Sequence, residues 1–326
     1  MKTLILVASM GLAACADDAF MGEVGKHALG ILEGADRVET FRTHSERDET
    51  VGANVVDGYP VVKTGPEKDA AFAKRILSQL KHEETEPNDL ECAFVPHDAF
   101  RVWKGKEHVD VLICFHCDQV QVTSFPPKAA EPIRALGDFE EKSGPWFVLC
   151  REAFPDDGDL GRMEAAKLGP SKKVKEFLGD GIVGIIQDFD LVEIFRIKPK
   201  EEHHITGPRI EDQDVLGRSD EDIADLDMDL KGSLLDEGTY SFRSVKGCTF
   251  EPGLAFRIQS KKSGTIEILV CFSCDEVMIT RIPDGDAKPE PRKEDCDGAR
   301  PALLRIAKAA FPDDKVIQGL KVERGK

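Results

Sequence analysis

After its first 15 residues, this 326-residue sequence has no apolar run that approaches the roughly 20 residues of a membrane-spanning helix. It also has no glycine-rich phosphate loop, no serine or cysteine nucleophile motif and no pair of carboxylates at matched spacing. Histidine is absent after His204. These absences argue against an integral membrane protein and leave no recognisable class of enzyme.

The chain has fewer basic residues than acidic ones. Lys and Arg number 44 against 61 Asp and Glu, which gives a net charge of −17. Such a surface is repelled by nucleic acid and by anionic lipid head groups, so we expect no nucleic-acid partner. The acidity itself indicates little beyond solubility.

The N-terminus has the pattern of an export signal. Lys2 precedes an apolar run over residues 3–14, a combination typical of secretory signals. The end of this run, Leu12-Ala13-Ala14-Cys15, resembles the lipobox of bacterial lipoproteins. In that family the cysteine receives diacylglycerol and becomes the new N-terminus. The resemblance implies a signal peptide over residues 1–15, lipidation at Cys15, and a mature chain anchored to the membrane on the periplasmic or outer side of the cell envelope.

Two other interpretations of the N-terminus stay open. Ala14-Cys15-Ala16 also fits the A-x-A pattern of ordinary signal cleavage after Ala16, which predicts a secreted soluble protein. A chance apolar helix at the start of a cytoplasmic protein is the third interpretation.

Most of the chain occurs twice. Cys92, the motif Cys114-Phe115-His116-Cys117-Asp118 and residues 153–157 recur in order as Cys248, Cys271-Phe272-Ser273-Cys274-Asp275 and residues 310–314, at an offset of 156 or 157. Residues 36–42 match residues 190–196. We infer a tandem duplication, with repeats at residues 30–157 and 184–320 and a linker at residues 158–183.

Periodicity predicts the same order of elements in each repeat. In the first repeat the elements are a strand at 36–42, an amphipathic helix at 69–80, a hairpin of 92–103 with 107–116, a strand at 120–124 and a helix at 146–154. A variable, proline-rich loop precedes the last helix. After that helix, the aspartates of Phe-Pro-Asp-Asp can accept hydrogen bonds from the backbone amides of the next segment. The fold class is therefore α+β, a β-α-β-β-β-α unit with helices on one face of an antiparallel sheet.

The cysteines lie at a special point of this sheet. A two-residue turn at Lys104-Gly105 would place Cys92 opposite Cys117, within reach of a disulfide. The apolar residues also change phase between Cys117 and Val120, so a β-bulge or a sharp reversal must absorb one residue at Cys-Phe-x-Cys-Asp in both repeats. Three cysteines are shared by the repeats, whereas Cys150 and Cys296 each occur in one.

Three kinds of site remain open at these cysteines. The candidate residues are Cys92, Cys114 and Cys117 in the first repeat and Cys248, Cys271 and Cys274 in the second. A structural disulfide would join Cys92 to Cys117 or Cys114, and Cys248 to Cys274 or Cys271. Exported chains form such bonds readily. Zinc would need a fourth ligand, for which His97 or His116 is present in the first repeat only. A site common to both repeats would use cysteines alone, or cysteines together with Asp118 and Asp275. Redox chemistry usually places such a motif at a helix N-terminus, whereas strands flank it here.

Charged residues on the first strand are also shared. Glu39 and Arg42 match Glu193 and Arg196, and Arg101 matches Arg257. This pattern fits an ion pair in a cleft or simply a polar outer face of the sheet. By contrast, His97, His108 and His116 have no histidine counterparts in the second repeat, so a function shared by both repeats cannot depend on them.

The sequence thus predicts a lipid-anchored, non-enzymatic envelope protein that binds a protein or small ligand between its two domains, or has a structural role, without a cofactor. The alternative is a thiol redox or metal-handling protein, with zinc as the metal, that uses the two Cys-Phe-x-Cys motifs.

Overall fold

The computed structural model describes most of the chain between Ala19 and Val322. The described residues are 19–44, 55–83, 93–139, 142–198, 209–210, 213–221, 223, 226–242, 246–283 and 290–322. The chain divides into two compact units, Met1–Asp156 and Asp157–Lys326, and each combines helices with an antiparallel sheet. Within this described part, no helix is long and apolar enough to cross a membrane.

The first unit contains one long sheet and three helices among its described residues. Its elements are α1 (Ala19–Glu33), β1 (Arg37–Thr43), β2 (Val55–Val56), β3 (Tyr59–Thr64), β4 (Lys68–Asp69), α2 (Ala70–Leu80), β5 (Asp98–Lys104), β6 (Glu107–Cys114), β7 (Gln119–Ser124), β8 (Ile133–Asp138) and α3 (Ser143–Ala153). The strand order is β2-β3-β1-β5-β6-β7-β8, and β4 pairs with the start of β1.

The second unit has a sheet of the same strand order. Its elements are α4 (Gly158–Leu168), α5 (Lys172–Leu178), α6 (Asp180–Gln187), β9 (Leu191–Lys198), β10 (Arg209–Ile210), β11 (Gln213–Arg218), α7 (Leu226–Leu235), η2 (Glu237–Thr239), β12 (Leu254–Ser260), β13 (Gly264–Cys271), β14 (Glu276–Ile282), β15 (Pro291–Asp295), η3 (Asp297–Ala299), α8 (Arg300–Ala310) and α9 (Lys315–Gln318). The order β10-β11-β9-β12-β13-β14-β15 corresponds strand by strand to that of the first unit.

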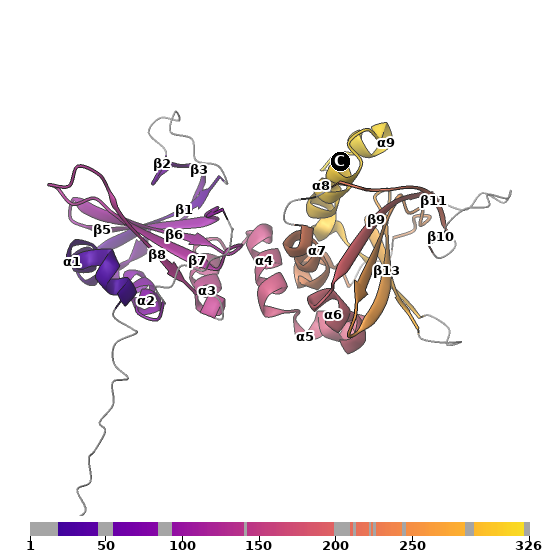
Figure 1. The fold of residues 1–326 in the computed structure, drawn as a ribbon, viewed down its shortest axis with the longest axis horizontal. Coiled ribbons are helices and arrows are strands. Elements are labelled where there is room, and N and C mark those ends of the chain that lie inside the picture. The colour runs from indigo at the N-terminus through magenta and orange to yellow at the C-terminus, as the bar shows by residue number, and fades with distance from the viewer. Residues whose placement is uncertain are drawn as a thin grey trace, which may run out of the picture. The chain divides into compact units, whose positions relative to one another are not determined.

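One face of each sheet packs against helices, as alternation along the strands predicts. In β6, Val109, Val111 and Ile113 are fully buried on one side of the strand. Phe72 of α2 meets Phe100 of β5 edge to face at 5.4 Å, which places α2 on this side. Figure 1 shows α1, α2 and α3 on the same side of the first sheet. In the second unit the corresponding core joins β12, β13 and β14 to α6, α7 and α8.

The opposite face of each sheet carries a smaller apolar cluster under a short hairpin. The β2–β3 hairpin lies on the side of the first sheet away from the helices (Figure 1). Its Val56 and Tyr59 pack on Phe41, Ala99 and Leu112 of the sheet. In the second unit Ile210 of β10 packs likewise on Phe195, Ile197, Ala255 and Leu269. Each sheet is therefore covered on both faces, although unequally.

Both units contain elements beyond the expected β-α-β-β-β-α order. The loop expected to be variable and proline-rich forms an edge strand in each unit, β8 and β15. The sequence signal for β8 is weak because its only buried residues are Ala135 and Gly137. A Cβ at Gly137 would lie 2.9 Å from the Phe20 ring of α1, so this close contact requires glycine.

The segment expected as a linker, residues 158–183, contains α4, α5 and the start of α6 within the second unit. The expected role of Phe-Pro-Asp-Asp is confirmed. Asp157 accepts a hydrogen bond from the Leu160 amide at 3.0 Å, and Asp314 accepts one from the Ile317 amide at 3.0 Å. The two aspartates therefore cap α4 and α9.

The predicted register of the β5–β6 hairpin was wrong. The turn residues are Gly105 and Lys106, and Lys104 pairs with Glu107. Gly105 has φ 62°, as the first central residue of a two-residue hairpin turn requires, and this places glycine one position earlier in the turn than expected. Extending this register puts Phe94, rather than Cys92, opposite Cys117. Cys92 itself lies outside the described residues.

The contact between α4 and α7 yields a test of the second unit. A Cβ at Gly232 would lie 2.6 Å from the Arg162 carbonyl oxygen of α4. We expect Gly232→Ala to lower the free energy of unfolding by about 1–2 kcal/mol, because overpacking against backbone outweighs the better helix propensity of alanine. Urea denaturation measures this change. Gly217→Ala, where no atom lies within 4 Å of the added Cβ, is the matched control. Equal stability of the two variants would contradict the packing.

Candidate functional site

The two Cys-Phe-x-Cys motifs form sharp reversals between neighbouring strands. The last pairs of the ladders are Cys114–Gln119 and Cys271–Glu276, so four residues make each loop. The final loop residue is Asp118 or Asp275, with φ 56° and 53°. Aspartate tolerates this left-handed conformation better than most residues do. The expected change of phase is therefore absorbed by a tight hairpin loop.

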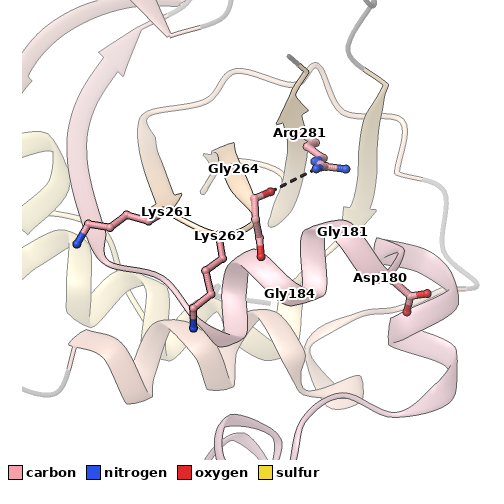
Figure 2. Close-up of a pocket in the computed structure, with 8 residues that line it drawn as sticks. Asp180, Gly181, Gly184, Lys261, Lys262, Gly264 and Arg281 are labelled. Atoms are coloured by element: carbon pink, nitrogen blue, oxygen red, sulfur yellow. Dashed lines mark hydrogen bonds between the residues drawn. The ribbon is translucent and has the colours of Figure 1, made fainter.

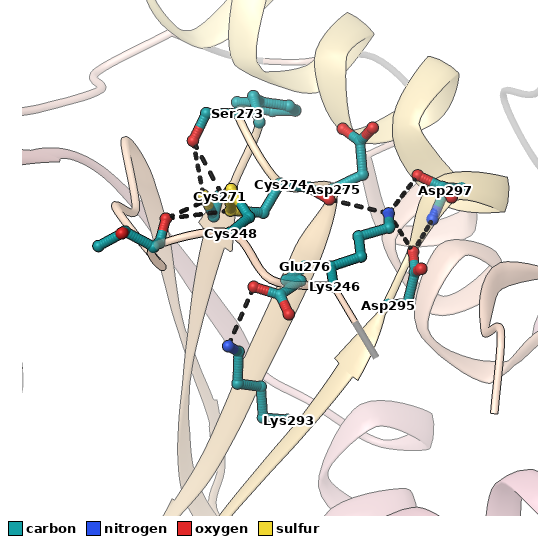
Figure 3. The surroundings of a disulfide bond; sticks show 12 residues. Lys246, Cys248, Cys271, Ser273, Cys274, Asp275, Glu276, Lys293, Asp295 and Asp297 are labelled. Atoms are coloured by element: carbon teal, nitrogen blue, oxygen red, sulfur yellow. Dashed lines mark hydrogen bonds and ion pairs between the residues drawn. A yellow bond between two sulfur atoms is a disulfide. The ribbon is translucent and has the colours of Figure 1, made fainter. Parts of the chain in front are cut away.

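A disulfide holds this loop in the second unit. Cys248 and Cys274 are bonded, with Cα atoms 5.9 Å apart (Figure 3). Cys274 is fully buried, whereas Cys248 is exposed and precedes β12 in a segment without regular structure. The bond therefore pins an irregular segment to the loop instead of crossing a strand ladder. In the first unit Cys117 is also disulfide-bonded.

The first cysteine of each Cys-Phe-x-Cys motif, Cys114 or Cys271, remains a thiol. Cys114 and Cys271 are both fully buried, and no helix begins at either loop. Burial raises the pKa of the Cys114 thiol, although the Cys117 amide donates a hydrogen bond to its sulfur at 3.3 Å. Cys150 and Cys296 are buried thiols too, and burial raises the pKa of Cys296.

Charged side chains surround the loop of the second unit (Figure 3). Arg300 donates to the Phe272 carbonyl at 2.8 Å and pairs with Asp275. Lys246 donates to the Cys274 carbonyl at 2.8 Å and contacts Asp295 and Asp297 at 2.7 Å each. The position of Arg300 corresponds to Ser143 in the first repeat, so comparison of the repeats drew no attention to it.

Glu39 and Arg101, two of the predicted charged residues, lie side by side on the face of the sheet away from the helices. Glu39 pairs with Arg101 across the ladder, and Arg101 pairs with Asp110. The Arg101 guanidinium donates two hydrogen bonds to the buried Asp110 carboxylate, at 2.7 and 2.9 Å. In the second unit Glu193, Arg257 and Glu267 occupy the same register positions, and Arg257 donates to Glu267 at 2.6 Å. This polar row is shared by the two units.

Arg42 and Arg196, by contrast, bind different partners. Arg42 lies 3.3 Å from the buried Asp98 carboxylate, whereas Arg196 pairs with Asp314 at 2.8 Å. A further polar residue, Asp57, escaped the sequence analysis. It occupies the turn of the β2–β3 hairpin at φ 45° and accepts hydrogen bonds from Gln121, Thr123 and Arg134 at 2.6 to 3.0 Å. The hairpin is thereby held against β7 and β8.

His97, His108 and His116 do not converge on the cysteines as a group. His97 contacts Arg42 at 2.6 Å, and His116 is exposed. The His108 ring lies at a tilt between the rings of Trp103 and Phe125, with ring centroids 4.6 and 4.8 Å apart, and burial lowers the pKa of His108. In the described part of the chain, no cluster of three or more His, Cys, Asp or Glu side chains is arranged to hold a metal ion.

A separate pocket of about 400 Å³ lies in the second unit, beside the start of α6 (Figure 2). It is lined by Asp180, Gly181, Gly184, Lys261, Lys262, Ser263, Gly264 and Arg281. Lys262 contacts Asp188 at 2.7 Å and Lys261 contacts Asp190 at 3.2 Å. Because both lysines already have carboxylate partners, the pocket has no strong excess of positive charge.

Comparison with known proteins returned no match to a family model, to a curated protein or to a solved structure.

The charged groups around Lys246 predict how stability responds to acid. Burial raises the pKa of Asp297, but the hydrogen bond from Lys246 lowers it, and the net shift is downward. A carboxylate with a lowered pKa in the folded state stabilises that state above the unfolded pKa, about 4, and this contribution is lost as the pH falls. Lys246→Met should therefore lower the melting temperature at pH 7, with the deficit shrinking toward pH 3. Thermal unfolding at each pH measures this, and a deficit independent of pH would contradict the assignment.

Proposed function

We propose that this chain is a lipid-anchored protein of the bacterial cell envelope with two duplicated domains and a non-enzymatic binding or structural role. The proposal requires no cofactor. It places the domains outside the cytoplasm, tethered through diacylglycerol on Cys15.

The observation that carries the proposal is the disulfide between Cys248 and Cys274, with a second bonded cysteine, Cys117, at the matching loop. Disulfides persist in oxidising compartments and are rare in the cytosol. The bonds close loops whose other cysteine is a buried thiol. This arrangement suits a braced scaffold better than a reactive centre, because reactive thiols are accessible and have lowered pKa values.

The corresponding strand orders and the shared polar row support the duplication. Glu39, Arg101 and Asp110 occupy the register of Glu193, Arg257 and Glu267. A single ancestral sheet that was copied explains why the loops, the row and the small apolar cluster recur together.

The first unit also has the side chains best suited to a binding surface. The Arg37 guanidinium lies 4.5 Å from the centroid of the Trp103 ring, and the His108 ring lies at a tilt between the rings of Trp103 and Phe125. All four are partly exposed. The matching positions of the second unit are Leu191, Gln259, Thr265 and Ile282. Tryptophan and arginine are enriched among the residues that dominate protein interfaces, so we assign binding to this strip of the first unit.

The alternative proposal is a thiol redox or zinc-handling protein that uses Cys114, Cys117, Cys271 and Cys274. It requires these thiols to cycle between bonded and free states, or to hold a metal ion. The two proposals differ in the number of thiols and in the metal content of the purified protein.

Counting thiols on the exported protein tests the proposal. Intact mass after alkylation of the unfolded, unreduced protein should show four thiols, corresponding to Cys114, Cys150, Cys271 and Cys296, with no bound zinc. Thiols that cycle under mild reductant, or about one metal ion per domain, would support the alternative. Eight thiols in the unfolded protein would contradict both the disulfides and export.

The anchor has its own test. Cys15→Ala should move the exported protein from the membrane fraction to the soluble fraction. Without the diacylglycerol, the protein loses the membrane-binding free energy that each buried methylene group contributes. Fractionation with an immunoblot measures this shift. A wild-type protein already in the soluble fraction would favour ordinary cleavage after Ala16.

A further inference from the structure

One thiol of the second unit lies beside the disulfide instead of in it. Cys271 is the last residue of β13, and Cys274 is the third of the four loop residues that follow it. The Ser273 hydroxyl lies 3.1 Å from the Cys271 sulfur and 3.9 Å from the Cys274 sulfur (Figure 3). A thiol, a hydroxyl and a disulfide are therefore gathered at one point. Nothing in the proposed scaffold role uses the thiol.

We propose that Cys271 exchanges with this disulfide, so that the second unit has two disulfide isomers. The Cys271 thiolate attacks the Cys274 sulfur, the bond between Cys271 and Cys274 forms, and the bond between Cys274 and Cys248 breaks. Cys248 leaves as a thiolate and takes up the proton that Cys271 released. The step needs no oxidant or reductant, because one thiol and one disulfide are present before and after it.

The surroundings of the loop favour this direction of attack. Cys271 and Cys274 share the Ser273 hydroxyl, which can donate to the thiolate that attacks. Cys248 is the exposed end of the disulfide, so the departing thiolate is released into solvent. The loop itself stays in place during the exchange, because Lys246 and Arg300 hold the Cys274 and Phe272 carbonyls.

The matching loop of the first unit is less suited to exchange. His116 stands in the place of Ser273 and is exposed. The two units should therefore differ, and the second should be the one that isomerises.

The consequence of exchange is a reactive thiol on the surface. It frees Cys248, in a segment without regular structure, from its covalent bond to the loop, while Lys246 keeps its hydrogen bond to the Cys274 carbonyl. Cys248 would then form mixed disulfides with a thiol of another protein. This inference rests on the disulfide of the proposed function, but it adds an activity that a passive brace lacks.

Alkylation of the folded, oxidised protein tests the exchange. The protein is held with N-ethylmaleimide at pH 7 to 8.5, then digested at acid pH and its disulfides are mapped by mass spectrometry. We expect alkylated Cys248 and a Cys271–Cys274 linkage to accumulate together, faster at higher pH. Ser273→Ala should slow this by about fivefold, the effect of losing one hydrogen bond of ordinary strength.

Two cysteine variants complete the design. Cys271→Ser should leave Cys248 bonded and unlabelled, whereas Cys296→Ser, which removes another buried thiol, should label like the wild type. If circular dichroism shows that Cys271→Ser does not fold, the rate of Cys248 alkylation in Ser273→Ala, compared with the wild type, tests the exchange instead. Cys248 that stays unlabelled in the wild type, or that labels equally without Cys271, would overturn the exchange. A map without any disulfide would instead overturn the proposed function.

Discussion

The rest of the structure depends on the reversal at Cys-Phe-x-Cys-Asp. A strand buried on both faces must turn back within four residues, and aspartate in the left-handed region completes the loop. The main chain then fixes the following edge strand, because the Asp118 and Asp275 carbonyls accept hydrogen bonds from the Phe139 and Cys296 amides at 2.8 and 2.7 Å. Loop, disulfide and edge strand form one connected brace at the same end of each sheet.

The two faces of each sheet have different physical roles. The helix side supplies most of the apolar burial and hence most of the stability. The opposite side combines a small apolar cluster with the polar row of Glu39, Arg101 and Asp110. A buried carboxylate such as Asp110 needs its bidentate arginine, so the row restricts which strands can pair and in what register. The row recurs in both units, while partly exposed residues beside it, such as Trp103 and Gln259, differ.

Sequence patterns predicted the parts of the fold with strong periodicity and missed those without it. The helix at 70–80 and strands β5 to β7 follow from alternating or helical apolar spacing. Strand β8 buries only Ala135 and Gly137, and the β2–β3 hairpin depends on Asp57 contacts from distant strands. The bond between Cys248 and Cys274 is one of the two pairings that the sequence left open, and the register that suggested it was wrong by two residues. Ser143 stands at the position of Arg300 in the first unit, so only the structure relates this arginine to the loop.

The brace at the cysteine loops is the central claim, and its free energy can be measured directly. The Cys248–Cys274 bond closes a loop of 26 residues, for which loss of chain entropy in the unfolded state gives about 3.5 kcal/mol. Urea unfolding of the exported protein with and without reductant, at neutral pH and with zinc chelated, compares the two states. The account predicts that reduction lowers the unfolding free energy of the second unit by roughly 2–4 kcal/mol. An unfolding free energy unchanged by reductant would contradict it.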